Sequence, residues 1–203
     1  KPKYPIFKTV NFKRRILLVT AHRRESFGGG LQDIFSALKR IVHRFKDVEI
    51  VYPVHLNPNV AEPAHQMLGS VERIHLMRPF TYEETYWIMD RCYAILTDSG
   101  GIQEEAPCFR KPVLVLRNVT ERTEGIAAGV AKLVGTNGMR IFKETEKLLT
   151  SPKLYRAMRA RVNPYGDGKS SQRIVQILTR ELRKPGIRSV KQMPRGLKVK
   201  ASV

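Results

Sequence analysis

Cysteines, long apolar runs and a starting Met are scarce or missing in this sequence. Cys92 and Cys108 are the only cysteines, which argues against a disulfide framework or a zinc site, and Cys92 is expected to be a buried free thiol. No segment approaches the roughly 18 consecutive apolar residues of a membrane span, and none resembles a signal peptide. We therefore expect a protein of the reducing cytoplasm with no membrane partner. Lys1 in place of an initiator Met suggests a fragment or a processed piece.

Acidic residues are missing from both ends of the chain. Residues 1–15 hold six Lys and Arg and residues 183–203 hold seven, without one Asp or Glu in either segment. Of the net charge of +19, only +6 is left for the middle, which suits an anionic small ligand. We expect residues 1–14 to form a basic extension or interdomain linker and residues 185–203 to form a basic tail.

The middle of the chain, residues 15–184, alternates short apolar runs with helical patterns and has room for one full-sized domain. Strands are predicted at 15–20, 48–52, 73–77, 92–97, 113–117 and 131–134. The longer helices are predicted at 31–45, 60–69, 82–91, 140–149, 152–161 and roughly 169–184. This alternation predicts an α/β fold with a doubly wound parallel sheet, in which ligands bind beyond the carboxyl ends of the strands.

The most informative stretch runs from Tyr93 to Pro107. Its apolar run ends in Asp98-Ser99-Gly100-Gly101, and helix-permissive residues with two carboxylates follow. This order predicts a buried strand, a tight turn and a helix start, where glycine backbones and unpaired N–H groups can meet an anion. An ordinary strand-to-helix turn with Ser99 as the N-cap is the structural alternative. Polar loops also follow the other predicted strands, at 21–30, 53–59 and 118–124.

Six motifs together resemble, in order and spacing, the carboxyl-terminal half of the non-hydrolysing UDP-N-acetylglucosamine 2-epimerases. They span about 150 residues and lie at 20–26, 52–58, 97–107, 111–117, 120–122 and 163–168. The resemblance implies the Rossmann-like, nucleotide-binding C-terminal domain of a two-domain GT-B fold, and a homodimer of the whole enzyme. It also implies elimination and re-addition of UDP without metal or nicotinamide cofactor. The carboxylates that move the C2 proton would belong to the amino-terminal half, which this sequence does not include.

The same resemblance suggests roles for individual residues. Ser99, Gly100 and Gly101 would hold the diphosphate, and Glu105 would accept hydrogen bonds from the ribose hydroxyls. His22 and Arg122 would stabilise charge on the leaving diphosphate, and His22 is the candidate catalytic residue. These roles also have a plainer alternative, since Glu105 and Arg122 suit a solvated surface. Glu104 is expected to lie on that surface.

Arg23 and His55 resemble positions that, in bacterial relatives, help hold a second, regulatory substrate molecule. Simple loop structure is the alternative for both. The segment 79–85 departs from the Leu-Pro-Phe of many relatives, so that uracil contacts are expected from the backbone near Phe80 rather than from its side chains. Ala21, Thr123 and residues 108–110 are further departures.

Three other functions remain open at this stage. A hydrolysing epimerase or a GT-B glycosyltransferase would use the same Ser-Gly-Gly and Glu105 contacts, and product analysis would separate them. From another class, the basic ends suggest a nucleic-acid-binding module. No basic motif with interleaved aromatic residues supports that module, so we expect no nucleic-acid partner.

Overall fold

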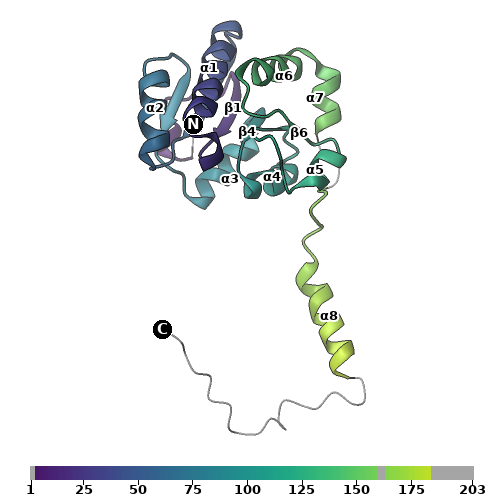
Figure 1. The fold of residues 1–203 in the computed structure, drawn as a ribbon. Helices are drawn as coiled ribbons and strands as arrows, with labels where there is room; N and C mark the ends of the chain where they lie inside the picture. The colour runs from purple at the N-terminus through teal and green to yellow at the C-terminus, as the bar shows by residue number, and fades with distance from the viewer. Residues whose placement is uncertain (1–2, 160–162, 184–203) are drawn as a thin grey trace, which may run out of the picture. The chain divides into compact units, whose positions relative to one another are not determined.

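A six-stranded parallel sheet forms the centre of the structure, a computed structural model that describes residues 3–159 and 163–183 (Figure 1). Its strand order is β3-β2-β1-β4-β5-β6, and every neighbouring pair is parallel. The predicted doubly wound α/β fold is therefore confirmed. The strands are β1 (Arg15–Thr20), β2 (Val48–Pro53), β3 (Ile74–Met77), β4 (Ala94–Thr97), β5 (Val113–Val115) and β6 (Ala131–Leu133).

Helices connect the strands along the chain. The α-helices are α1 (Gly29–Arg44), α2 (Pro58–Leu68), α3 (Tyr82–Arg91), α4 (Gly100–Glu105), α5 (Thr123–Ala127), α6 (Gly138–Thr150), α7 (Pro152–Met158) and α8 (Ser170–Leu182). Three short 3₁₀ helices accompany them: η1 (Pro5–Phe7), η2 (Arg24–Ser26) and η3 (Ala106–Phe109). The predicted bounds of β1 and α3 are confirmed, and the other predicted elements differ by one to three residues at one or both ends. Strand β4 begins later than predicted because the Cys92 N–H still bonds to the Ile88 carbonyl at the end of α3.

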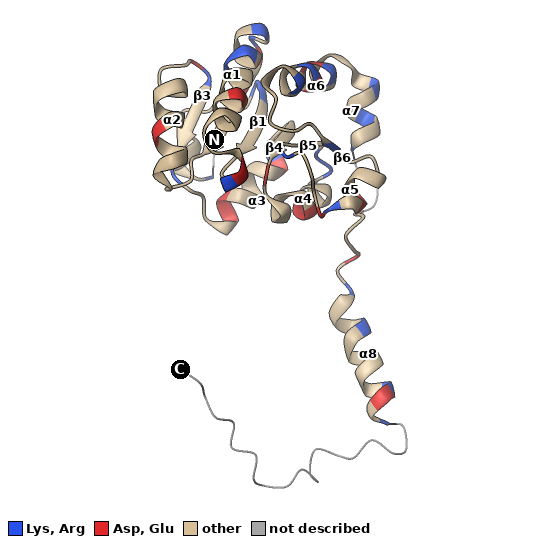
Figure 2. Ribbon diagram, viewed as in Figure 1, with Lys and Arg blue, Asp and Glu red and all other residues tan. Residues whose placement is uncertain are grey.

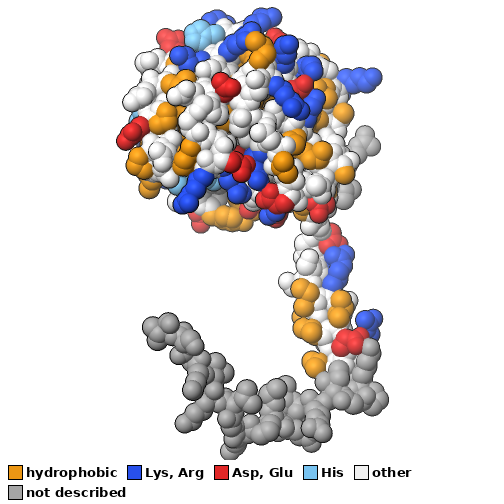
Figure 3. Space-filling model, in the orientation of Figure 1, with side chains coloured by type: hydrophobic (Ala, Val, Ile, Leu, Met, Phe, Trp, Pro, Cys, Tyr) orange, Lys and Arg blue, Asp and Glu red, His pale blue; other side chains and the backbone are white. Residues whose placement is uncertain are grey.

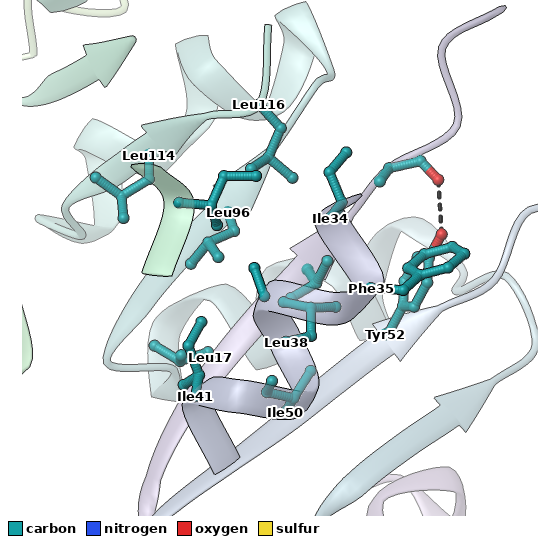
Figure 4. Close-up of a cluster of buried hydrophobic side chains, with 14 of the residues drawn as sticks. Leu17, Ile34, Phe35, Leu38, Ile41, Ile50, Tyr52, Leu96, Leu114 and Leu116 are labelled. Carbon is teal, nitrogen blue, oxygen red and sulfur yellow. Dashed lines mark hydrogen bonds between the residues drawn. The ribbon is translucent and has the colours of Figure 1, made fainter. Parts of the chain in front are cut away.

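Two buried clusters cover the two faces of the sheet, because successive side chains of a strand point to opposite faces. Leu17, Ile50 and Leu96 face α1, whose apolar side follows the predicted helical spacing (Figure 4). Ile16 and Leu18 face the other way, toward the cluster that contains α3. Helices α2, α6 and α7 complete the first layer, and η1, α3 and η3 belong to the second. Figure 2 shows Lys and Arg on the exposed sides of α1, α6 and α7.

The residues before β1 pack onto the second cluster. Phe7 is fully buried, stacks on Trp87 at 4.9 Å between ring centroids and meets Phe80 edge-on at 5.1 Å. Phe12 also meets Trp87 edge-on. The described part of the expected extension or linker thus contributes aromatic side chains to the domain core, although its Lys residues remain at the surface.

The chain divides into two compact units with a boundary between Tyr165 and Gly166. The second unit contains α8, on which no described residue is buried. Its exposed apolar side chains are visible in Figure 3, and they are Ile174, Val175, Ile177, Leu178 and Leu182. The expected basic tail at 185–203 lies outside the described residues, as do residues 160–162. Among the described helices, none has the length and apolarity needed to cross a bilayer.

Helix α3 begins with a capping box that also involves Arg78. The Thr81 hydroxyl accepts the Glu84 N–H, and the Glu84 carboxylate accepts the Thr81 N–H and two bonds from the Arg78 guanidinium. The Arg78 hydrogen bonds hold the pKa of Glu84 below its usual value of 4.5. A carboxyl group with a lowered folded-state pKa stabilises the fold above its ordinary pKa, and this contribution is lost as the pH falls below it.

We therefore expect Arg78→Met to flatten the acid side of the stability profile. Urea unfolding between about pH 6 and pH 3 should give a free energy of unfolding that falls less steeply with acid than in the wild type. Arg91→Met is the matched control, because Arg91 pairs with the exposed Asp90 at 3.0 Å, and it should keep the wild-type slope. Equal slopes for the wild type and Arg78→Met would contradict this assignment.

A second prediction concerns the segment before β1. Phe7→Ala should lower the free energy of unfolding by about 3–5 kcal/mol, because it opens a cavity among Trp87, Phe80 and Phe12. Leu56→Ala, at a side chain that is 78% exposed, is the control and should change stability by under about 0.5 kcal/mol. If the two variants unfold at the same urea concentration, residues 3–14 do not belong to the domain.

Candidate functional site

The candidate site lies at the carboxyl ends of β1 and β4, where the order of the strands reverses. Strand β1 pairs with β2 on one side and with β4 on the other, so the loops that follow these strands diverge and leave a crevice. His22 follows β1, His55 follows β2, and Ser99 follows β4. The topology therefore brings together three of the motifs that the sequence singled out.

A buried carboxylate joins the loops after β1 and β4. Asp98 is fully buried, and its Oδ2 accepts the backbone N–H groups of His22 at 2.6 Å and Arg23 at 2.7 Å. Below this junction the hydroxyls of Thr20 and Thr97 lie 2.5 Å apart. The first turn of the β1 loop is therefore fixed against β4. Arg23 contributes its backbone N–H to this junction.

The His22 ring lies between Asp98 and a second histidine. Its Nδ1 is 3.2 Å from Asp98 Oδ1, and its ring is stacked on that of His55 with 5.3 Å between centroids. His55 is exposed, and its Nδ1 accepts the Asn57 N–H at 3.1 Å. His55 therefore makes the local loop contact that was the alternative to a regulatory role. It also contacts His22, the candidate catalytic residue.

Ser99 is the N-cap residue of α4, but its hydroxyl makes no capping bond. Its N–H donates to Thr97 Oγ1 at 3.0 Å, and its carbonyl accepts bonds from the backbone and side chain of Gln103. The Ser99 hydroxyl therefore does not perform the ordinary N-capping role that the sequence allowed. Gly101 is exposed, whereas Gly100 is buried.

Arg122 lies over the start of α4. A Cβ added to Gly100 would meet its guanidinium group at 3.4 Å. The Arg122 guanidinium donates to Glu104 and lies 3.4 Å from the Glu121 carboxylate, so it is paired with acidic side chains. Glu104, expected to be a surface residue, is the partner of Arg122 and is half exposed. Figure 2 shows acidic residues on α4.

Buried and partly buried hydrogen bonds hold the backbone around Arg122. Thr120 Oγ1 accepts the Arg122 N–H at 3.1 Å and donates to Gln103 of α4 at 2.8 Å. Tyr165, from the last of the six motifs, donates to the Arg122 carbonyl at 3.4 Å and accepts the Gly125 N–H at 3.1 Å. The third motif and the last two are therefore connected in space.

Glu105 occupies the last turn of α4 and is partly buried. Burial, and secondly the neighbouring charge of Glu104, raises the pKa of its carboxyl. A carboxylate in this position has lost hydration that a hydroxyl donor of a ligand would replace.

A cavity of about 180 Å³ connects several of these side chains. Its lining includes His22, His55 and Ser99, and also Phe80 and Thr85 from the segment that departs from the family pattern. Gly100 and Arg122, which lie close to each other, are not part of the lining, and neither are Arg23, Gly101 and Glu105. The remaining lining residues are Leu18, Thr20, Pro53, Pro79 and Ile102.

A larger hollow of about 450 Å³ follows the edge strand β3 and contains none of the predicted site residues. We assign the site to the smaller cavity, because it gathers loops from three neighbouring strands at the switch point. Within the described part of the chain, His, Cys, Asp and Glu side chains form no group of three that could hold a metal ion.

Two residues near the site were missed by the sequence reasoning. Asp98 was included in the turn motif but was given no role. Thr85 was not expected to contribute a side chain, and it lies on α3 where the helical pattern alone does not show which side faces the crevice.

Comparison with known proteins identifies the family. The profile of the UDP-N-acetylglucosamine 2-epimerases matches residues 2–179. The chain is 50% identical over 176 residues to UDP-N-acetylglucosamine 2-epimerase of Salmonella typhimurium and 49% identical over 175 residues to that of Bacillus subtilis. These matches cover 87% and 86% of the chain, and 46% of each relative. The chain therefore spans about half the length of these relatives.

Solved structures agree in fold. MnaA of S. aureus, solved with UDP, superposes with a TM-score of 0.84 at 44% sequence identity. The match covers 89% of this chain and 49% of that one. The UDP-GlcNAc 2-epimerase of Neisseria meningitidis, solved with UDP-GlcNAc, superposes with a TM-score of 0.82 at 40% identity, over 86% of this chain and 48% of that one. On the sequence, the fold and the arrangement of the motifs, the chain belongs to the UDP-N-acetylglucosamine 2-epimerase family.

Proposed function

We propose that this chain is the UDP-binding half of an enzyme that interconverts UDP-N-acetylglucosamine and UDP-N-acetylmannosamine by eliminating and re-adding UDP. The observation that carries the proposal is the cavity at the switch point, which joins His22 and Ser99 in a domain whose relatives were solved with UDP and UDP-GlcNAc. Homodimerisation of the whole enzyme and a cytoplasmic location are parts of the same proposal, and the free thiols of Cys92 and Cys108 suit a reducing compartment.

The start of α4 would hold the diphosphate. The Ser99 hydroxyl is not used as a cap, and the N–H groups of Gly100 and Gly101 open the helix without side chains in the way. Arg122 lies above Gly100 and would exchange its contact with Glu104 for one with a phosphate oxygen.

The nucleoside would extend along α3 and α4. Glu105 would accept the ribose hydroxyls, since its partly dehydrated carboxylate is an acceptor of hydrogen bonds without a donor of its own. Phe80 and Thr85 line the cavity and would meet the uracil. Phe80 is held from behind by Phe7 of the buried aromatic cluster.

The reaction begins with removal of the C2 proton by a base. The C1–O bond breaks as its electron pair leaves with the diphosphate, and the sugar keeps a C1–C2 double bond. Adding UDP back to C1 and a proton to the opposite face of C2 completes the epimerisation. His22 and Arg122 would stabilise the negative charge on the departing diphosphate.

The proton chemistry needs carboxylates on both faces of C2, and this chain does not offer them at the cavity. Among the described residues that line it, none is Asp or Glu. Glu105 is assigned to the ribose, and Asp98 is buried behind His22. The base and acid would therefore come from the part of the relatives that this chain does not cover.

We predict that the chain binds UDP but does not convert UDP-N-acetylglucosamine. Calorimetric titration should show one UDP site, and product analysis should show neither UDP-N-acetylmannosamine nor free N-acetylmannosamine. Turnover by the chain alone would refute the division of labour, and a transferred glycoside would favour a glycosyltransferase. Binding of nucleic acid that survives removal of residues 185–203 and weakens steeply with salt would favour the nucleic-acid-binding alternative.

The ribose contact has a sharper test. Glu105→Gln should weaken UDP binding about tenfold, because it replaces a charged acceptor with a neutral one, and should reduce the preference for UDP over 2′-deoxy-UDP. Glu62→Gln, at an exposed position of α2, is the matched control and should leave both affinities unchanged. If Glu105→Gln keeps the full wild-type preference for UDP, another group recognises the 2′-hydroxyl.

The regulatory role proposed for Arg23 and His55 is tested in the whole enzyme. His55 stacks on His22, so a second substrate molecule at His55 would touch the catalytic loop directly. His55→Ala should abolish activation by substrate and turn a sigmoidal rate curve into a hyperbolic one. Unchanged substrate activation in this variant would remove His55 from the site.

A further inference from the structure

Asp98 faces three nitrogen atoms of the loop after β1. One oxygen accepts two backbone N–H groups, and the other, Oδ1, lies 3.2 Å from Nδ1 of His22. Oδ1 has no hydrogen-bond partner among the described residues, and the side chain has no exposure to water. A buried carboxylate oxygen without a donor is costly, so the ring nitrogen beside it is the group that can satisfy it.

The loop holds the ring in this position from several sides. The buried Tyr52 donates to the Ala21 carbonyl at 2.7 Å, a contact shown in Figure 4. Burial and the Asp98 charge raise the pKa of Tyr52, which keeps its hydroxyl a donor. His55 stacks on the outer face of the His22 ring. The backbone on either side of His22 is thus fixed, and Nδ1 lies 3.2 Å from the Asp98 carboxylate.

We propose that Asp98 is the positioning residue for His22: it holds the neutral imidazole as the Nδ1–H tautomer and leaves Nε2 as the nitrogen that meets the ligand. When the ring takes a second proton, Asp98 faces one N–H and the other N–H serves the diphosphate. This catalytic use rests on the function proposed above. The tautomer itself does not, because it follows from contacts within the free chain.

The test uses Asp98→Asn, which has the shape of Asp but can reverse the hydrogen bond. The amide oxygen can still accept the His22 and Arg23 N–H groups, while the amide nitrogen would donate to His22 Nδ1. The neutral ring should then change from the Nδ1–H to the Nε2–H tautomer. Nitrogen-15 NMR of histidine-labelled chain, at a pH high enough for neutral rings, reports this as an exchange of the two ring-nitrogen shifts, with the His22 signals assigned from a His22→Gln spectrum.

Thr97→Val provides the matched control. It removes the Thr20 contact and the acceptor of the Ser99 N–H from the same junction but leaves the carboxylate in place. This variant should lose stability and keep the wild-type His22 tautomer, which separates positioning by Asp98 from loosening of the loop.

Each outcome decides the question. An Nε2–H tautomer in the wild-type chain, or an unchanged tautomer in Asp98→Asn, would overturn the proposal. The wild-type spectrum alone gives the first answer, even if Asp98→Asn does not fold. A wild-type chain with the Nδ1–H tautomer that fails to bind UDP would instead contradict the proposed function and leave the positioning intact.

Discussion

The buried carboxylate of Asp98 is the constraint around which the crevice is built. Because it is shielded from water, its oxygens must find donors within the protein, and the donors at hand are in the loop after β1. The sheet places β1 beside β4, so one residue at the end of β4 can fix the loop of its neighbour. A parallel sheet thereby converts a strand-end acid into an anchor for a loop that is distant in sequence.

Most of the fold could be predicted from the sequence, since buried parallel strands are short apolar runs and the helices that cover them carry apolar residues at helical spacing. The exact match at α3 reflects a capping box that is visible as Thr81 and Glu84. The burial of residues 3–14 was harder to predict. Their Lys and Arg residues indicate a solvent-exposed segment, whereas Phe7 and Phe12 pack into an aromatic cluster. Charge and burial alternate there without a helical or strand period.

The site was predictable at the level of motifs rather than of contacts. Polar loops after strands indicate where a ligand binds, and the likeness to the family suggested which residues to consider. Pairings such as Arg122 with Glu104, or the stacking of His55 on His22, depend on rotamers and loop paths that no local pattern encodes. The roles of these residues with UDP stay predictions. Asp98 illustrates the gap, since its place in the sequence was plain and its partners were not.

The ion pair between Arg122 and Glu104 has a consequence for how a ligand enters and leaves. A guanidinium without a carboxylate partner would bind a diphosphate tightly, and its charge would be unpaired each time the diphosphate left. Arg122 is already paired with Glu104, so under the proposed function an arriving phosphate would replace the Glu104 carboxylate and Glu104 would return when the phosphate leaves. Competition from Glu104 would then lower the affinity of Arg122 for the diphosphate and speed the release of product.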